Sequence, residues 1–224
     1  MGYKAGMTPF GQSGCVRGTG WRGRRFETSS TRWGFSLVEL LVVLALMIIL
    51  TVMMWGFTSE SHQHATQRAC QQNLEKIYVA LQIYANDFSG QLPVVTNALT
   101  SEEPLSLLVP RYTADTAIFI CPGSKDSPLP SGVSFAHRTI SYAYYMGQRL
   151  GDAQQPLMSD WQINTSPKQT GDLAFSTTGK PPGNNHYKYG GNILFCDGHA
   201  ELTPPRLLFS LATSNGVVLL NPKP

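Results

Sequence analysis

A nearly uninterrupted apolar run, from Phe35 to Trp55, constrains this chain more than any other feature of its sequence. The run has 21 residues, and only Ser36, Glu39 and Thr51 are polar. An α-helix needs about 20 such residues to cross the hydrocarbon core of a bilayer. A helix of this length in a soluble protein usually carries a polar stripe, and none is present. The run therefore predicts a transmembrane helix over residues 35–55.

The residues before this run carry the basic charge of the chain. Residues 1–34 contain six basic residues and one acid, a net charge of +5, so the other 190 residues sum to −2 within the total of +3. Basic residues favour the cytoplasmic side of a span, which predicts a cytoplasmic N-terminus and an exported C-terminal part. No basic stripe with interleaved aromatic residues follows residue 34, so we expect no nucleic-acid partner.

A glutamate near the start of the run is the unusual element, because a carboxylate at bilayer depth is costly and usually has a partner. The string Gly34-Phe35-Ser36-Leu37-Val38-Glu39 resembles the prepilin peptidase site of type IV pilins and type II secretion pseudopilins. That pattern is a glycine, a phenylalanine, and a glutamate at the fifth position of the mature chain. The alternative is an uncleaved signal anchor, in which Glu39 reaches the membrane interface.

The resemblance implies specific processing and a specific partner for the glutamate. Prepilin peptidase would cut between Gly34 and Phe35, and Phe35 would then be N-methylated. Glu39 would pair with the N-terminal ammonium of a neighbouring subunit in a filament. Simple removal of the apolar run is not expected, because no Ala-x-Ala site follows Leu50.

The apolar spacing continues beyond the membrane run. Residues Leu74, Ile77, Tyr78, Leu81 and Tyr84 follow helical periodicity, and Ser89-Gly90 is a typical helix end. We therefore expect four segments: a cleaved basic leader over 1–34, a transmembrane helix over 35–55, an amphipathic continuation over 56–90, and an exported globular domain over 91–224.

Short apolar runs separated by Pro, Gly, Ser and Asn follow Pro93. They predict an α+β fold in which a small antiparallel sheet packs on the long helix, the pilin-like architecture that the resemblance also implies. The expected elements are a short helix over 105–109, strands over 117–120, 139–146 and 155–161, a hairpin of 192–196 and 199–202 with a two-residue turn, and a helix or edge strand within 207–220.

The hairpin contains a second recognisable string. The stretch around it resembles the C-terminal signature of bacterial pseudopilin-like proteins, a His, nine residues and then Asp-Gly; here ten residues separate His186 from Asp197. We expect Asp197-Gly198 to form the turn and His186 to hold the preceding loop by a hydrogen bond, with no metal or cofactor. The alternatives are a metal site of His186, Asp197 and His199 and a calcium site of Asp197 with loop carbonyls.

Four cysteines are present, of which Cys15 lies in the expected leader. Export places Cys70, Cys121 and Cys196 in an oxidising compartment, where one disulfide can form between them. Three pairings are open. Cys70 with Cys121 is favoured, because Cys196 lies in a predicted strand and is typical of a small core residue.

The resemblance implies a non-enzymatic subunit of a periplasmic pseudopilus or pilus-like filament that serves type II secretion. Its implied partners are prepilin peptidase/methyltransferase, other pseudopilins, the assembly platform of the inner membrane, and the lipid bilayer. A DNA-uptake or adhesion pilin is a related possibility. The competing class is a membrane-anchored exported binding protein or enzyme that uses His186, Asp197 and His199. No Gly-x-Ser-x-Gly elbow or P-loop supports a common enzyme class.

Overall fold

The structure is a computed structural model that describes residues 34–126, 133–211, 213 and 216–224. The predicted leader up to residue 33 lies outside the described residues. The chain divides into two compact units, residues 1–48 and 49–224. The described part of the first unit is the segment Gly34–Ser36 and the beginning of helix α1 (Leu37–Asp87).

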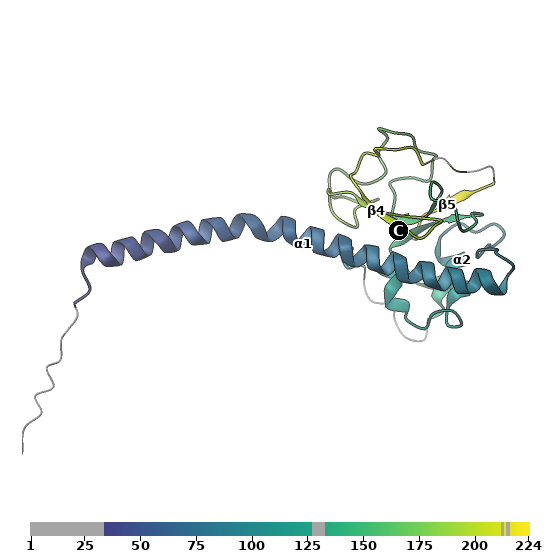
Figure 1. Ribbon diagram of the computed structural model, residues 1–224, viewed down its shortest axis with the longest axis horizontal. Helices are drawn as coiled ribbons and strands as arrows, with labels where there is room; N and C mark the ends of the chain where they lie inside the picture. Colours follow the sequence, from purple (N-terminus) through teal and green to yellow (C-terminus); the bar gives the residue numbers. More distant parts are fainter. Residues whose placement is uncertain (1–33, 127–132, 212, 214–215) are drawn as a thin grey trace, which may run out of the picture. The chain divides into compact units, whose positions relative to one another are not determined.

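Helix α1 is 51 residues long and joins the predicted membrane run to the amphipathic segment in one element (Figure 1). It ends three residues before the predicted boundary at residue 90. Ser89 and Gly90 both have positive φ, and the Gly90 N–H donates to the Ala85 carbonyl oxygen at 2.7 Å. Left-handed residues of this kind stop a helix and satisfy its last carbonyls.

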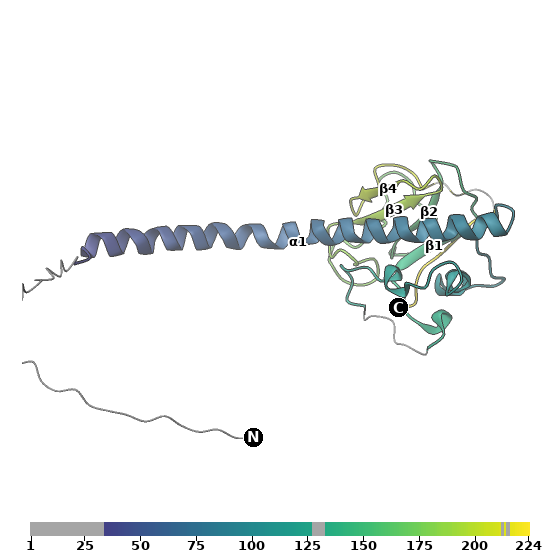
Figure 2. The same ribbon diagram turned by 60° about the horizontal axis from the view of Figure 1, so that its bottom comes forward.

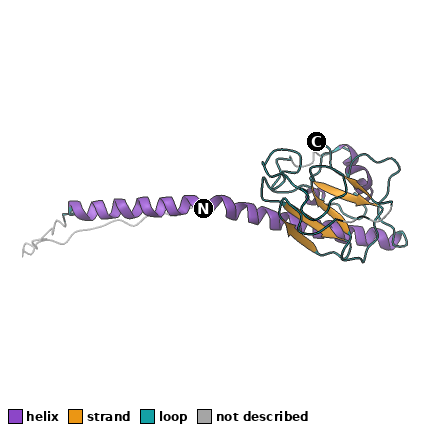
Figure 3. Cartoon of the chain, turned by 90° about the horizontal axis from the view of Figure 1, so that it is seen from above, coloured by secondary structure: helices purple, strands orange, loops and turns teal. Residues whose placement is uncertain are grey.

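Five strands form one antiparallel sheet with the order β4-β3-β2-β1-β5. The strands are β1 (Tyr142–Met146), β2 (Pro156–Asp160), β3 (Gly191–Phe195), β4 (Ala200–Thr203) and β5 (Val218–Leu220). Within residues 49–224, the C-terminal half of α1 runs along one face of this sheet (Figures 2 and 3). The α+β class and the antiparallel sheet are as predicted, and the chain's tail supplies edge strand β5.

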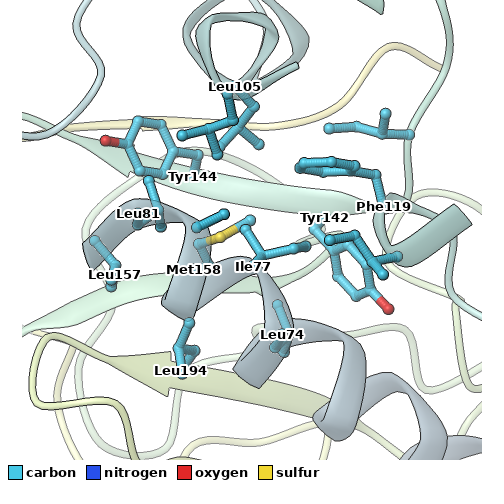
Figure 4. Packing of buried hydrophobic residues seen from close by; sticks show 14 of the residues in the cluster. Leu74, Ile77, Leu81, Leu105, Phe119, Tyr142, Tyr144, Leu157, Met158 and Leu194 are labelled. Carbon is cyan, nitrogen blue, oxygen red and sulfur yellow. The ribbon is translucent and has the colours of Figure 1, made fainter. Parts of the chain in front are cut away.

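The main core lies between α1 and the sheet (Figure 4). Leu74, Ile77 and Leu81 of α1 are fully buried there, as their helical spacing predicts. Because successive strand residues point to opposite faces, Tyr142 and Tyr144 of β1 face α1. Ala143 and Tyr145 belong to clusters on the other side. On that second face, Ile193 and Phe195 of β3 form a cluster with residues from the segments before β3 and after β4. These residues are Ala174, Phe175, Leu207 and Leu211.

Two local predictions were wrong. Residues Thr116–Phe119 form the 3₁₀ helix η2 and not a strand, because the Asp115 carboxylate accepts the Ala117 N–H at 3.0 Å and caps a helical turn. The hairpin loop between β3 and β4 has four residues, 196–199, and is not a two-residue turn. Only Gly198 has a positive φ (97°), whereas a two-residue type I′ turn needs it at both central positions.

Short helices occupy the segment before the sheet. They are α2 (Glu102–Leu105), η1 (Ser106–Leu108) and η3 (Phe135–His137). The first two replace the short helix expected over 105–109. The Glu102 side chain is buried, and its Oε1 accepts the backbone N–H groups of Ile140 (3.3 Å) and Lys223 (2.9 Å). Glu102 thereby attaches the last residues of the chain to the body.

The hydroxyl groups of several tyrosines and the thiol of Cys196 are buried in the body. We therefore expect the fold to lose stability at alkaline pH. Burial raises the pKa of the Cys196 thiol to about 12, helped by the charges of Asp152 and Asp197. Burial likewise raises the pKa values of Tyr142, Tyr144 and Tyr145. The folded state therefore keeps these protons while the unfolded chain loses them.

We expect the free energy of unfolding to fall as pH rises above about 9. Each group contributes a slope of roughly 1.4 kcal/mol per pH unit between its unfolded and folded pKa values. Cys196 begins this loss near pH 9 and the tyrosines add to it above pH 10. Urea unfolding at stepped pH measures the slope, and Cys196→Ala should flatten it between pH 9 and 10. A stability that stays constant up to pH 11 would contradict this account.

Candidate functional site

The predicted processing site lies in an open segment. Gly34, Phe35 and Ser36 have no regular secondary structure, and Phe35 is 79% exposed. Glu39 lies in the first turn of α1, where a negative charge also suits the helix dipole. Gly34 and Phe35 are therefore exposed residues directly ahead of a helix.

The helix after this segment is apolar and uncovered. Among the described residues, one helix is long and apolar enough to cross a membrane; its apolar window is Leu37–Met54, and none of that window is buried. A helix of this kind near the N-terminus either spans a membrane or serves as a signal sequence.

A second candidate site is a buried polar cluster formed by strands β2 and β3 and the loop before β3. It is here named the Asp160 cluster: Asp160, Asn185, His186 and Asn192. Asp160 is the last residue of β2, Asn192 lies in β3, and the other two belong to the loop before β3. All four are at most 3% exposed. A buried carboxylate is tolerated only where hydrogen-bond donors surround it.

The Asp160 carboxylate has such donors on both oxygens. Its Oδ1 accepts from the Asn185 side-chain amide at 3.0 Å. Its Oδ2 accepts from the Asn192 backbone N–H at 2.6 Å and from the Asn192 side-chain amide at 3.0 Å. The His186 Nε2 lies 3.2 Å from the same oxygen. The carboxylate is therefore fixed by donors from two different segments.

The amides of the cluster connect it to the rest of the body. The Asn192 side chain also donates to the backbone oxygen of Gln67 on α1 at 3.0 Å, and the Asn185 side chain donates to the Ser141 oxygen at 2.7 Å. In return, the Gln67 side chain donates to the Tyr189 oxygen at 3.2 Å. The cluster thus joins α1, the sheet and the loop before β3.

The same nitrogen of His186 also lies beside a disulfide. Its Nε2 lies 3.4 Å from the Cys121 Sγ, and Cys121 is bonded to Cys70 of α1. This is the pairing that the sequence favoured, and Cys196 is a buried free thiol. The His186 Nδ1 is buried without a hydrogen-bond partner among the described residues. A Cβ added at Gly123 would lie 2.5 Å from that nitrogen, so the ring needs a glycine beside it.

The structure does not bring His186, Asp197 and His199 together. His186 is fully buried, while Asp197 and His199 pair with each other in the exposed hairpin loop. Burial raises the pKa of Asp197, but hydrogen bonds from the backbone N–H and ring of His199 outweigh this and leave it lowered. Gly198 makes the turn as expected, and Tyr78 packs where its side chain would be. The metal site predicted as an alternative from these three residues is wrong.

Sequence reasoning missed Asp160 and Asn192 as partners of His186, and Asn185 as a partner of Asp160. Comparison with protein-family models, with curated proteins and with solved structures gave no match.

Proposed function

We propose that this protein is a pilin-like structural subunit, processed between Gly34 and Phe35 and assembled through α1 into a filament at the inner membrane. We propose type II protein secretion as the role of this filament. Residues 49–224 would then lie in the periplasm, with the N-terminus on the cytoplasmic side. The observation that carries the proposal is the spacing of Gly34, Phe35 and Glu39 at the start of an uncovered apolar helix.

An apolar helix without a covering surface supports this proposal. Large contiguous apolar surfaces on soluble proteins mark contacts with lipid or other chains. Lipid would cover Leu37–Met54 before assembly, and the equivalent helices of neighbouring subunits would cover it afterwards. Glu39 is the only acidic residue in this window, so it is the natural partner for a neighbour's terminal ammonium.

The competing enzyme hypothesis has less support. It required His186, Asp197 and His199 to act together, and these residues lie in different environments. His186 and Asp160 are buried and hold structural contacts with α1 and the sheet. We therefore propose a mechanical and not a catalytic role for the exported body.

The processing step is tested by intact mass and N-terminal sequencing of the full-length chain, isolated from membranes of cells that contain prepilin peptidase. We expect a chain that begins at N-methylated Phe35. Gly34→Val should block cleavage, because the branched side chain crowds the scissile bond, whereas Gly23→Val in the leader should leave it intact. A wild-type chain that keeps residues 1–34 would overturn the proposal.

A further inference from the structure

Four buried side chains from separate segments place metal-binding atoms next to one another. They are Cys70 on α1, Cys121 after η2, Asp160 at the end of β2, and His186 before β3. Their ligand atoms all lie within 4.8 Å of one another, and each residue is at most 1% exposed. Two sulfurs, an imidazole nitrogen and a carboxylate oxygen form a donor set that suits Zn²⁺.

The distances within this group fit a tetrahedral site. Bonds of about 2.0 to 2.3 Å to zinc place neighbouring ligand atoms roughly 3.3 to 3.8 Å apart. The His186 Nε2 lies 3.4 Å from the Cys121 Sγ and 3.2 Å from the Asp160 Oδ2. The two sulfurs are closer than this, because they are bonded to each other at 2.09 Å, and the remaining pairs of ligand atoms lie within 4.8 Å.

We propose that Cys70, Cys121, Asp160 and His186 bind one Zn²⁺ when the Cys70–Cys121 disulfide is reduced. A dithiol reductant would supply two electrons and two protons to open the S–S bond and would itself become a disulfide. Zinc then displaces the two thiol protons. His186 would bind zinc through the lone pair of Nε2, with its ring proton on Nδ1.

The surroundings of the four ligands favour this arrangement. Asn185 and Asn192 donate to the Asp160 carboxylate and fix its orientation, as the hydrogen-bonded neighbours of ligating carboxylates do. Two reduced sulfurs held in a dry interior have few polar partners, and a buried thiolate is costly without a compensating cation. The same four side chains therefore serve a disulfide in one redox state and a metal in the other.

The disulfide and the zinc site use the same two sulfurs, so they cannot exist together. Zinc binding would therefore precede disulfide formation in the maturation of the protein. A chain that enters the exported compartment with free thiols would hold α1 against the sheet through zinc. A disulfide oxidant would then take two electrons from the two thiolates and become a dithiol with two protons from water, releasing Zn²⁺ as the Cys70–Cys121 bond forms. The inference concerns residues 49–224 alone and does not depend on filament assembly.

The test uses the full-length protein in detergent micelles, with Cys15→Ser so that only the three body cysteines remain. A phosphine reduces the disulfide without binding the metal; it becomes the phosphine oxide, with oxygen from water. Co²⁺ is titrated anaerobically as a spectroscopic probe and is then displaced with Zn²⁺. We expect one Co²⁺ per reduced chain, with thiolate charge-transfer and tetrahedral d–d absorption, and none in the oxidised chain.

Matched variants separate this site from incidental binding. His186→Gln should lower the affinity for Zn²⁺ at least tenfold and change the cobalt spectrum. Cys196→Ser and His199→Gln, which remove the other thiol and the exposed histidine, should change neither. Binding that is absent from the reduced chain, or that follows Cys196 or His199, overturns the proposal.

Protease resistance provides a second readout if reduction of the disulfide unfolds the chain. If the reduced chain becomes sensitive to protease, Zn²⁺ should restore resistance, because a metal that binds only the folded state stabilises it. The His186→Gln variant should show no such rescue. A reduced wild-type chain that unfolds and is not rescued by Zn²⁺ would likewise overturn the proposal.

Discussion

Replacing Asp160 by alanine is expected to lower the free energy of unfolding of the exported body by about 5 kcal/mol. The substitution removes the carboxylate oxygens that accept hydrogen bonds from the Asn185 side-chain amide and from the backbone N–H and side-chain amide of Asn192. It also removes the partner of the His186 Nε2. Each donor would stay buried with a weaker partner or none, at roughly 1 to 3 kcal/mol each. A loss of this size is a large part of the stability of an ordinary domain.

Urea unfolding of the full chain in micelles measures this effect. Cys196 provides the readout, because it is the one free thiol of the body and is buried, so its alkylation follows unfolding. Asp172→Ala is the matched control: that carboxylate is exposed and accepts the Gln169 N–H at 2.8 Å. We expect the control to cost about 1 kcal/mol or less. A similarly small loss for Asp160→Ala would mean that the cluster is not a structural centre of the body.

The elements that sequence predicted best are those with a strong periodic signal. Leu74, Ile77 and Leu81 lie one helical turn apart, and all three are buried against the sheet. The strand-like runs around Tyr142–Met146 and Pro156–Asp160 also form strands, and their apolar residues are buried in the body. The spacing of apolar residues predicts which side of an element is buried, and that side packs against the core.

The parts that sequence missed depend on contacts between distant segments. Asp160 and Asn192 are separated by 32 residues, and Asn192 and Gln67 by 125. A single aspartate at the end of a strand gives no local sign of such partners. The Asp115 cap that converts residues 116–119 into a 3₁₀ turn is a local signal, but the apolar run after it suggested a strand.

Loss of filament assembly in a Glu39→Ala variant is the second expected result. In the proposed filament, each Glu39 carboxylate lies among apolar helices and pairs with the terminal ammonium of a neighbouring Phe35. Removing one partner of a desolvated ion pair costs about 3 to 5 kcal/mol, because the other charge stays buried and unpaired. That energy corresponds to a contact weaker by roughly 10²-fold to 5 × 10³-fold, and it recurs at every subunit added.

The experiment compares filament yield, membrane level and N-terminal processing in the same cells. Glu39→Ala should still insert and should still be cut after Gly34, because it keeps the apolar helix and the scissile bond. Its filaments should fall below detection. Glu75→Ala removes an exposed acid from the body half of α1 and should assemble normally. Wild-type filament yield from Glu39→Ala would show that Glu39 is only an interfacial residue of a membrane anchor, since an anchor needs an apolar span and gains nothing from a carboxylate at this position.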